Sequence, residues 1–429
     1  MPRVSSKRRP RQRSRVALAL AGGGPLGAIY EIGALCALQD ALEGIALNRL
    51  DHYVGVSAGG FMAAALANGL TPRDLCASFI ENQGDPSDLL DPSWFMVPAY
   101  AEFAQRALLL PWLTGAALWD WWVRRKSLPR AMEQLGASLP TGIFANNVID
   151  QHLTRLFSQP GRTNDFRQLA TRLTLVATNL DSGEATPFGE PGWDDVPISR
   201  AVQASAALPG LFPPVLIRGQ HYVDGALKKT MHASVALDEG ADLLICLNPL
   251  VPFDASAPDA PGRGSDGRRI PRIVEGGLPA VLSQTFRSMI HSRMALGMKH
   301  YAQDYPQTDI VLIEPDQRDA ELYLANTFSY SNRRQLAEHA YQQTLAMLRT
   351  GIFNERLARH GIALHADFWR EGHTLLADNR SASRPPGSHP TGPAQSLRTL
   401  SRTLDQLAAV VQQMHVSGSA PLPAARRVK

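Results

Sequence analysis

Residues 52–59 have the sequence His52-Tyr53-Val54-Gly55-Val56-Ser57-Ala58-Gly59. The apolar run before Gly55 is typical of a strand, and the small and apolar residues 61–68 are typical of a helix. A serine between close-packed glycines on such a turn has its hydroxyl pushed out of the edge of the sheet. We therefore expect Ser57 to be the nucleophile of an acyl-transfer enzyme, with Gly55 and Gly59 permitting the tight turn.

A second glycine-rich turn lies nearer the N-terminus. The apolar run 16–20 is followed by Ala21-Gly22-Gly23-Gly24-Pro25-Leu26-Gly27. Acyl transfer develops negative charge on the carbonyl oxygen, and glycines let several backbone N–H groups converge on it without obstruction. The dipole of the following helix adds to that stabilisation. We expect Gly22, Gly23 and Gly24 to form an oxyanion hole, with Gly27 supporting the turn.

A carboxylate follows the short strand expected at residues 221–223. Residues 222–226 are Tyr222-Val223-Asp224-Gly225-Ala226. Because Gly225 lets the chain turn before Ala226, the Asp224 carboxylate can lie close to a nucleophile. A nucleophile, oxyanion donors and a base or orienting group are the three parts that nucleophilic catalysis requires. The three segments together predict a catalytic site built around Ser57 and Asp224.

These motifs resemble those of the patatin-like phospholipase family, which includes plant storage lipid acyl hydrolases and many bacterial proteins. The family's glycine-rich loop corresponds to residues 22–27, its G-x-S-x-G motif to 55–59 and its D-G-[AG] motif to 224–226. Residues 201–215 also resemble the family's segment ahead of the aspartate. The resemblance implies a bacterial-type serine lipid acyl hydrolase with a Ser57–Asp224 dyad and no catalytic histidine.

The resemblance implies hydrolysis of fatty acyl esters, as in a phospholipase A or a lysophospholipase. A carboxylesterase, or a hydrolase of neutral lipids or thioesters, would use the same dyad and stays an alternative. One departure from the family pattern bears on this choice. Leu26 stands where the family usually carries Arg or Lys, so the loop lacks a cation that could meet a lipid phosphate.

A Ser-His-Asp triad is the nearest mechanistic rival. His52 lies five residues before Ser57 on an extended strand, which places it roughly 16 Å from the turn. His221 lies three residues before Asp224, on the opposite face of its strand. His232 is therefore the histidine that remains as a candidate base.

Two other function classes fit parts of the sequence. Gly22, Gly24 and Gly27 match a dinucleotide-binding fingerprint, with Glu43 at the offset of a ribose-binding acid. This oxidoreductase interpretation is a remote alternative, because it leaves the serine and aspartate motifs without a role. A non-catalytic lipid-binding module would keep an aromatic surface and lack a reactive serine.

The order of the predicted elements favours an α/β fold, a three-layer sandwich with a central, mostly parallel sheet. Continuous apolar runs, typical of buried strands, alternate with helical segments. We also expect a helical insertion and a helical C-terminal region. The expected strands are 16–20, 52–56, 173–177, 215–218, 221–223, 243–247 and 309–313, and the expected helices are 25–42, 58–68, 72–82, 276–300 and 332–349.

Residues 85–140 interrupt this alternation with a hydrophobic, tryptophan-rich insertion. Tryptophan prefers the membrane–water interface, and the basic run 124–126 could meet lipid headgroups. The apolar stretch is shorter than the roughly 20 residues of a spanning helix, and Pro111 and Asp120 interrupt it. We expect an interfacial lid or acyl-chain channel, with an ordinary buried insertion as the alternative. The residues expected at the interface are Trp112, Trp119, Trp121 and Trp122.

The formal net charge of +4 comes from the N-terminal arm. Residues 1–15 carry seven positive charges and no acid, so the rest of the chain has a net charge of −3. We expect a disordered arm that contacts anionic lipid, and the lack of interleaved aromatic residues argues against nucleic acid as a partner. The apolar run after the arm is too short for a signal peptide. Three scattered cysteines suit a reducing compartment, so we expect a cytoplasmic protein with peripheral membrane contact.

The expected domain order is a basic arm (1–15), a catalytic core (16–250), an exposed loop (251–275), a helix and strand completion of the core (276–377), a linker (378–394) and a C-terminal amphipathic helix with a tail (395–429). Apolar residues over 397–414 alternate at spacings of three and four. This stripe favours a helix that docks on the body, with homo-oligomerisation as an alternative. No metal-ligand or cofactor motif is recognisable, and neither is expected.

Overall fold

The computed structural model describes residues 13–83, 97–123, 127, 136, 138–254, 272–319, 321–322, 333–369 and 372–376. The chain divides into two compact units, a larger one of Met1–Val97 and Thr141–Leu376 and a smaller one of Pro98–Pro140 and Ala377–Lys429. Several sequence-based expectations lie outside the described residues. They are most of the basic arm, the run 124–126, most of the loop 251–275, the linker 378–394 and the stripe 397–414.

A mixed sheet of eight strands forms the middle layer of the larger unit. Its strands are β1 (Val16–Leu20), β3 (His52–Gly55), β4 (Arg172–Asn179), β5 (Ala185–Phe188), β6 (Val215–Ile217), β7 (Gln220–Asp224), β8 (Leu243–Leu247) and β9 (Asp309–Ile313). The strand order is β6-β7-β4-β3-β1-β8-β9, with β5 paired to β4. Strands β4, β3, β1, β8 and β9 are parallel, whereas β5, β6 and β7 pair antiparallel.

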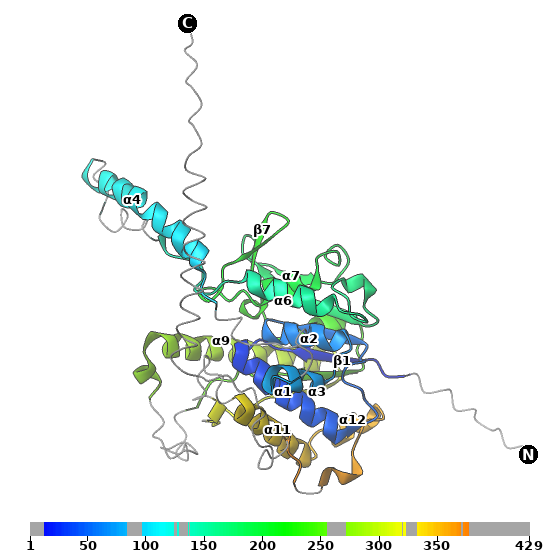
Figure 1. Ribbon diagram of the computed structural model, residues 1–429. Coiled ribbons are helices and arrows are strands. Elements are labelled where there is room, and N and C mark those ends of the chain that lie inside the picture. Colours follow the sequence, from blue (N-terminus) through cyan, green and yellow to red (C-terminus); the bar gives the residue numbers. More distant parts are fainter. Residues whose placement is uncertain are drawn as a thin grey trace, which may run out of the picture. The chain divides into compact units, whose positions relative to one another are not determined.

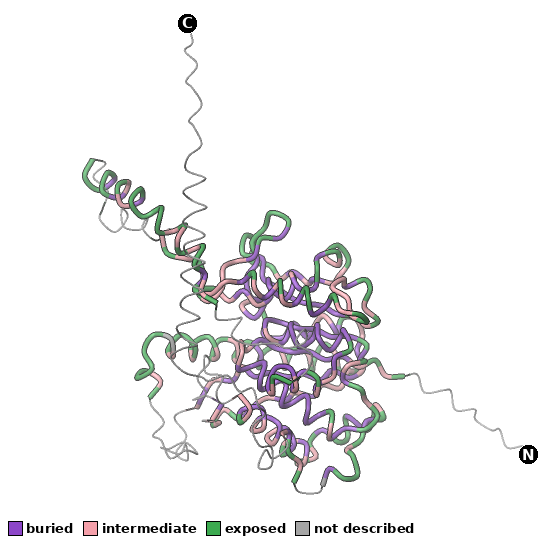
Figure 2. The backbone as a smooth tube through the Cα atoms, in the orientation of Figure 1, coloured by how far each residue is buried: buried purple, intermediate pink, exposed green. Residues whose placement is uncertain are grey.

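Helices cover both faces of this sheet, because its strand side chains are apolar on both sides. Leu18 and Leu20 of β1 belong to one apolar layer, whereas Ala17 and Ala19 of the same strand belong to the other. Figure 2 shows the buried segments gathered along β1 and the helices that pack on it. The helices of the larger unit are α1 (Gly24–Ala41), α2 (Ala58–Ala67), α3 (Pro72–Leu75), α6 (Asn147–Phe157), α7 (Ile198–Ser205), α8 (Ser234–Asp238), α9 (Gly277–Asp304), α11 (Arg333–Arg349) and α12 (Asn354–Arg359).

The three-layer α/β architecture expected from the sequence is therefore confirmed (Figure 1). Helices α1, α2 and α11 lie on one face of the sheet, and α8 and α9 lie on the other. The strands expected at 16–20, 243–247 and 309–313 coincide with β1, β8 and β9. A short pair outside this sheet, β2 (Leu42–Glu43) with β10 (Ala363–Leu364), was not expected.

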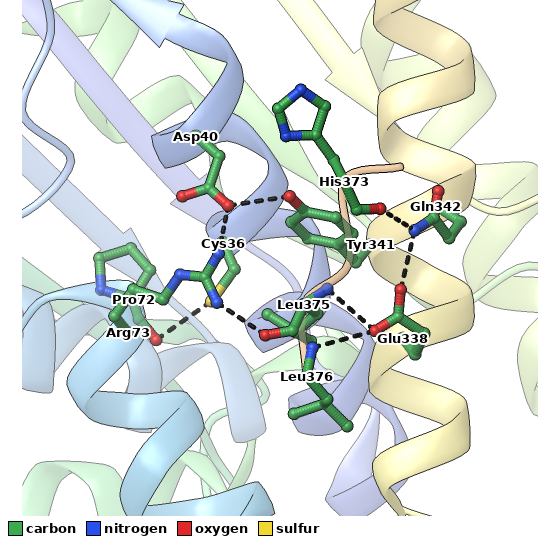
Figure 3. A network of polar contacts seen from close by, with 10 residues as sticks. All are labelled: Cys36, Asp40, Pro72, Arg73, Glu338, Tyr341, Gln342, His373, Leu375 and Leu376. Carbon is green, nitrogen blue, oxygen red and sulfur yellow. Dashed lines mark hydrogen bonds and ion pairs between the residues drawn. The ribbon is translucent and has the colours of Figure 1, made fainter. Parts of the chain in front are cut away.

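Helix α1 carries the glycine-rich loop at its N-terminus and is anchored at its C-terminal end. A Cβ on Gly33 would collide with the carbonyl of Ala337, so α1 and α11 cross at close range. Further along α1, Asp40 accepts a hydrogen bond from the Tyr341 hydroxyl of α11 at 2.8 Å and pairs with Arg73 of α3 (Figure 3). These contacts fix the helix whose other end bears Gly22 to Gly24.

The same network holds a later segment of the chain. Arg73 donates to the carbonyl of Leu375 at 2.8 Å, and Glu338 of α11 accepts the N–H groups of Leu375 and Leu376 (Figure 3). Residues 372–376 are thus bound to the helical layer that supports α1.

The smaller unit contains one long described helix, α4 (Tyr100–Trp122). Pro111 and Asp120, which interrupt the apolar run, both lie inside it, so neither residue ends the helix. Proline removes one backbone hydrogen bond, and the remaining bonds of a 23-residue helix carry the chain past it. Across the described part of the chain, no helix combines the length and apolar character needed to cross a bilayer.

Candidate active site

Ser57 lies at the sharp turn between β3 and α2. Its backbone has φ 55° and ψ −124°, a region that residues other than glycine rarely adopt. A Cβ on Gly55 would lie 2.5 Å from Gly60 Cα, and one on Gly59 would collide with the carbonyl of Ala21. Only glycine therefore fits on either side of the serine, which is the geometry that the sequence predicted.

Asp224 is the last residue of β7 and is buried. The Ala226 N–H donates to its Oδ1 at 2.8 Å, and the Ser57 side chain lies near enough to lower the pKa of the carboxyl. Strand pairing sets Asp224 opposite Ala177 of β4, and the Thr178 hydroxyl donates to the Asp224 carbonyl at 3.1 Å. These contacts fix the carboxylate at the end of β7.

The environment of Asp224 makes its carboxyl an effective proton acceptor near neutral pH. Burial raises the pKa of this carboxyl from 3.8 to about 6, while the nearby Ser57 side chain and the hydrogen bond from the Ala226 N–H oppose the rise. A base works best when its pKa lies near the working pH. A carboxyl with this pKa could accept a proton from a neighbouring hydroxyl near neutral pH.

The glycine-rich loop closes the site from a third direction. A Cβ on Gly22 would lie 3.0 Å from the Cβ of Ser57 and 3.5 Å from the Cβ of Ala226, so the backbone of Gly22 packs against both. Within the described residues, the N–H groups of Gly22, Gly23 and Gly24 donate to no protein acceptor. Three segments far apart in the chain thus meet at one point, with main-chain donors beside the serine.

Pro249 packs against the glycine-rich loop at Gly23 and Gly27. A Cβ on Gly23 would lie 2.7 Å from Gly27 Cα and 2.8 Å from Pro249 Cγ, and one on Gly27 would lie 3.0 Å from the same Pro249 atom. A side chain at Gly23 would therefore displace the loop backbone itself. Sequence analysis gave no role to Pro249, which follows β8.

Ser205 is a second residue whose role sequence analysis missed. It lies at the end of α7, and its side chain contacts the backbone of Ser57 at 2.8 Å. The available signal was that residues 201–215 resemble the family segment ahead of the aspartate. That resemblance pointed to the helix and did not identify the contact.

The histidines considered for a triad lie in other environments. His232 is buried, and its Nε2 hydrogen-bonds the Gly225 carbonyl at 3.2 Å; burial lowers its pKa to about 4. His52 begins β3 and bonds Thr174, and His221 is exposed beside Asp181. None of the three hydrogen-bonds to Ser57 or Asp224 among the described contacts.

Glu43 does not occupy the place of a ribose-binding acid. It lies in β2, beyond the C-terminal end of the 18-residue helix α1, about 27 Å along the helix axis from the glycine-rich loop. The neighbours of β1 in the sheet are β3 and β8, so no strand brings Glu43 back to the loop. The dinucleotide interpretation therefore lacks its acid. No group of three or more His, Cys, Asp or Glu side chains that could hold a metal is found in the described part of the chain.

The model of the patatin-like phospholipase family matches residues 18–237, just over half of the chain. The chain belongs to this family. The matched region contains the glycine-rich loop, Ser57 and Asp224, and the family expectation from the sequence is confirmed. Membership identifies the protein in general terms as a lipid acyl hydrolase.

A search of solved structures found a loose likeness to VipD from Legionella pneumophila. The two chains share 18% sequence identity with a TM-score of 0.36, over 79% of this chain and 67% of that one.

Proposed function

We propose that this member of the patatin-like phospholipase family hydrolyses fatty acyl esters of lipids in the manner of a phospholipase A or lysophospholipase. Ser57 is the nucleophile, Asp224 is its base, and the N–H groups of Gly22 to Gly24 form the oxyanion hole. The observation that carries this proposal is the close packing of Gly22 against both Ser57 and Ala226, which brings the serine turn, the glycine-rich loop and the turn after Asp224 together.

The reaction proceeds in two halves. The Asp224 carboxylate accepts the Ser57 proton as the serine oxygen attacks the ester carbonyl, and the oxyanion is held by the glycine N–H groups at the start of α1. The intermediate then expels the alcohol, which takes the proton from Asp224. Asp224 next deprotonates a water molecule, which attacks the acyl-serine. The second intermediate expels the Ser57 oxygen, which takes the proton back from Asp224, and the fatty acid leaves.

Substrate choice within this chemistry rests on other parts of the chain. Leu26, which stands where the family usually has a cation, is buried in the apolar layer beneath α1. Recognition of a lipid phosphate therefore needs cations elsewhere. A carboxylesterase, or a hydrolase of neutral lipids or thioesters, would use the same dyad.

We also propose that the lipid surface is met through the tryptophan-rich helix α4 and the basic N-terminal arm. The side chains of Trp112, Trp119, Trp121 and Trp122 are all exposed on α4. Tryptophan is enriched at membrane–water interfaces, which supports this role over that of a buried insertion. Self-association through residues 397–414 stays a separate proposal, which mass measurement of a truncation at residue 394 would test.

Fatty acid release from phospholipid, lysophospholipid, glyceride and short-chain ester substrates tests the function. We expect Ser57→Ala and Asp224→Asn each to abolish hydrolysis, and a fluorophosphonate probe to label wild type and not Ser57→Ala. Asp181→Asn, a carboxylate in an exposed turn, is the matched control and should keep full activity. Hydrolysis at the wild-type rate by either dyad variant would exclude the dyad, and inactivity of the wild type on every substrate would exclude the function.

A further inference from the structure

Helix α9 has two apolar faces. One face packs on the sheet, where Met294 is buried beside Met298 and Tyr301. On the opposite face, exposed apolar side chains recur at intervals of three, four or seven residues, which aligns them along the helix. These residues, here called the α9 stripe, are Leu278, Leu282, Phe286, Met289 and Leu296, with exposed fractions of 70%, 45%, 40%, 45% and 57%.

The charge of α9 is mostly basic. The helix contains Arg287, Arg293 and Lys299, and its one acidic residue is the last, Asp304. An exposed apolar face beside an excess of basic residues is typical of helices that lie on membrane surfaces.

A cavity of about 540 Å³ lies between the C-terminal half of α9 and the chain that follows Asp224. Its lining includes Lys229 and Arg293, which contact neutral groups of the described residues: Lys229 contacts the Ser234 hydroxyl at 3.5 Å, and Arg293 donates to the Leu227 carbonyl at 2.6 Å. Lys228, at the same cavity, pairs with Glu184. Lys229 and Arg293 are therefore available to an anionic ligand.

The rest of the lining fits a lipid headgroup region. Met231, Met294 and Met298 make apolar walls. The lining has two acidic residues: Asp238, which accepts a hydrogen bond from the Tyr305 hydroxyl, and Asp304 at the end of α9. Arg293 and Leu296 line the cavity and also lie on or beside the α9 stripe, so the apolar and cationic surfaces are continuous.

This surface lies on a helix that borders the candidate active site. Ile290 of α9 packs against Val56 and Ala226, the neighbours of the serine and aspartate turns. The Thr230 hydroxyl also donates to the Ile290 carbonyl at 3.1 Å, which joins the cavity wall to the helix. Docking at α9 would therefore hold the site close to the docked surface.

We propose that the α9 stripe and the cationic cavity beside it form a surface that docks on a bilayer containing anionic phospholipid. Charge decides between the possible occupants: a second copy would present the same cations, whereas an anionic bilayer complements them and accepts the apolar side chains. The proposal uses residues other than the α4 tryptophans and the basic arm. It rests on the proposed function only in that a lipid substrate brings the protein to a bilayer.

Co-sedimentation of the full chain with phosphatidylcholine vesicles, with and without phosphatidylglycerol, tests the proposal. Leu282→Asp with Met289→Asp, and separately Lys229→Glu with Arg293→Glu, should each weaken binding to anionic vesicles by about tenfold or more. The matched controls are Leu216→Asp and Arg155→Glu, exposed positions on β6 and α6, which should bind like wild type. Hydrolysis of a short-chain monomeric ester should stay at the wild-type rate in all four variants, which also shows that they fold.

Three results would overturn the proposal. The first is unchanged vesicle binding by both double variants. The second is protection of the α9 stripe from hydrogen exchange in the free monomer. The third is a wild-type dimer that Leu282→Asp with Met289→Asp converts to a monomer. Failure of the proposed function looks different, because the wild type would then hydrolyse no ester while its vesicle binding could still be measured.

Discussion

The backbone N–H of Ser57 donates a hydrogen bond of 2.8 Å to the hydroxyl oxygen of Ser205. The Ser205 hydroxyl in turn donates to the carbonyl of Val176 in β4 at 2.6 Å, and it is fully buried. A Cβ on Gly225 would collide with that same carbonyl, so the Asp224–Gly225 turn rests on it. One hydroxyl thus ties the serine turn to the strand that supports the aspartate turn, and it occupies the backbone N–H of Ser57.

We expect Ser205→Ala to lower kcat for a short-chain ester by roughly ten- to a hundredfold, with KM unchanged. The change leaves a buried N–H and a buried carbonyl without their partner, at a cost of about 1–3 kcal/mol, and frees Ser57 from the position in which it meets Asp224. Steady-state kinetics with thermal unfolding on the same preparations measures both effects.

Ser199→Ala on the same helix is the matched control for this change. Ser199 is equally buried, and its hydroxyl accepts hydrogen bonds from Thr154 and Asn164 at 3.0 Å each. Its loss should lower stability by a similar amount and leave kcat alone. Equal losses of kcat in the two variants would show that Ser205 only stabilises the fold.

The value of kcat/KM should fall as the pH is lowered, with a midpoint near pH 6. Burial raises the pKa of Asp224 to about 6, and below that pH the protonated carboxyl cannot accept the Ser57 proton. The dependence of kcat/KM on pH, measured with an uncharged monomeric ester, reports this group in the free enzyme. A profile that stays flat down to pH 4.5 would contradict Asp224 as the base.

Asp224→Asn should make the protein more stable above pH 7. The folded-state pKa is raised, so the stability that Asp224 contributes is complete below the unfolded value of 3.8 and is lost as pH rises through about 6. Replacing the carboxylate by a neutral amide should therefore raise the free energy of unfolding by about 3 kcal/mol at pH 8 and have little effect near pH 4. Denaturant unfolding at the two pH values checks this, with Asp181→Asn as a control that should show no such difference.

His232→Asn should keep most of the activity and the same acid limb near pH 6. The histidine bonds the Gly225 carbonyl and adopts φ 47°, a conformation that asparagine also tolerates. Loss of nearly all kcat, in a variant whose unfolding temperature is close to that of wild type, would favour a triad over the dyad.

The site was predictable where the chemistry depends on local backbone geometry. The glycines around Ser57 and in the 22–27 loop mark positions where a Cβ cannot fit or where an N–H must stay exposed. A few consecutive residues of the sequence are enough to recognise such positions. The contact of Ser205 with Ser57 spans 148 positions, and nothing local to residue 205 indicates it.

Two features of the helices could not be predicted for a different reason. Helix α9 has apolar residues on two opposite sides, so its sequence pattern shows no single apolar face. Only the packing of Met294 in the structure distinguishes the core face from the exposed one. In α4, Pro111 signals a break, but the propensity of one residue is outweighed by the helical bonds on both sides.

Gly22→Ala should abolish most of the hydrolysis while the protein still folds. The added Cβ would lie 3.0 Å from Ser57 Cβ and 3.5 Å from Ala226 Cβ, so it enters the space between the nucleophile and the aspartate turn without meeting backbone. The substitution keeps the N–H of residue 22, but the crowding should move it out of reach of the oxyanion, and an oxyanion donor that no longer reaches typically costs about 100- to 1,000-fold in rate. Gly59→Ala should behave differently, because its Cβ would collide with the carbonyls of Leu20 and Ala21 and unfold the turn. Turnover measured beside the unfolding temperature separates the two outcomes. Wild-type turnover in a folded Gly22→Ala would remove the loop from the reaction.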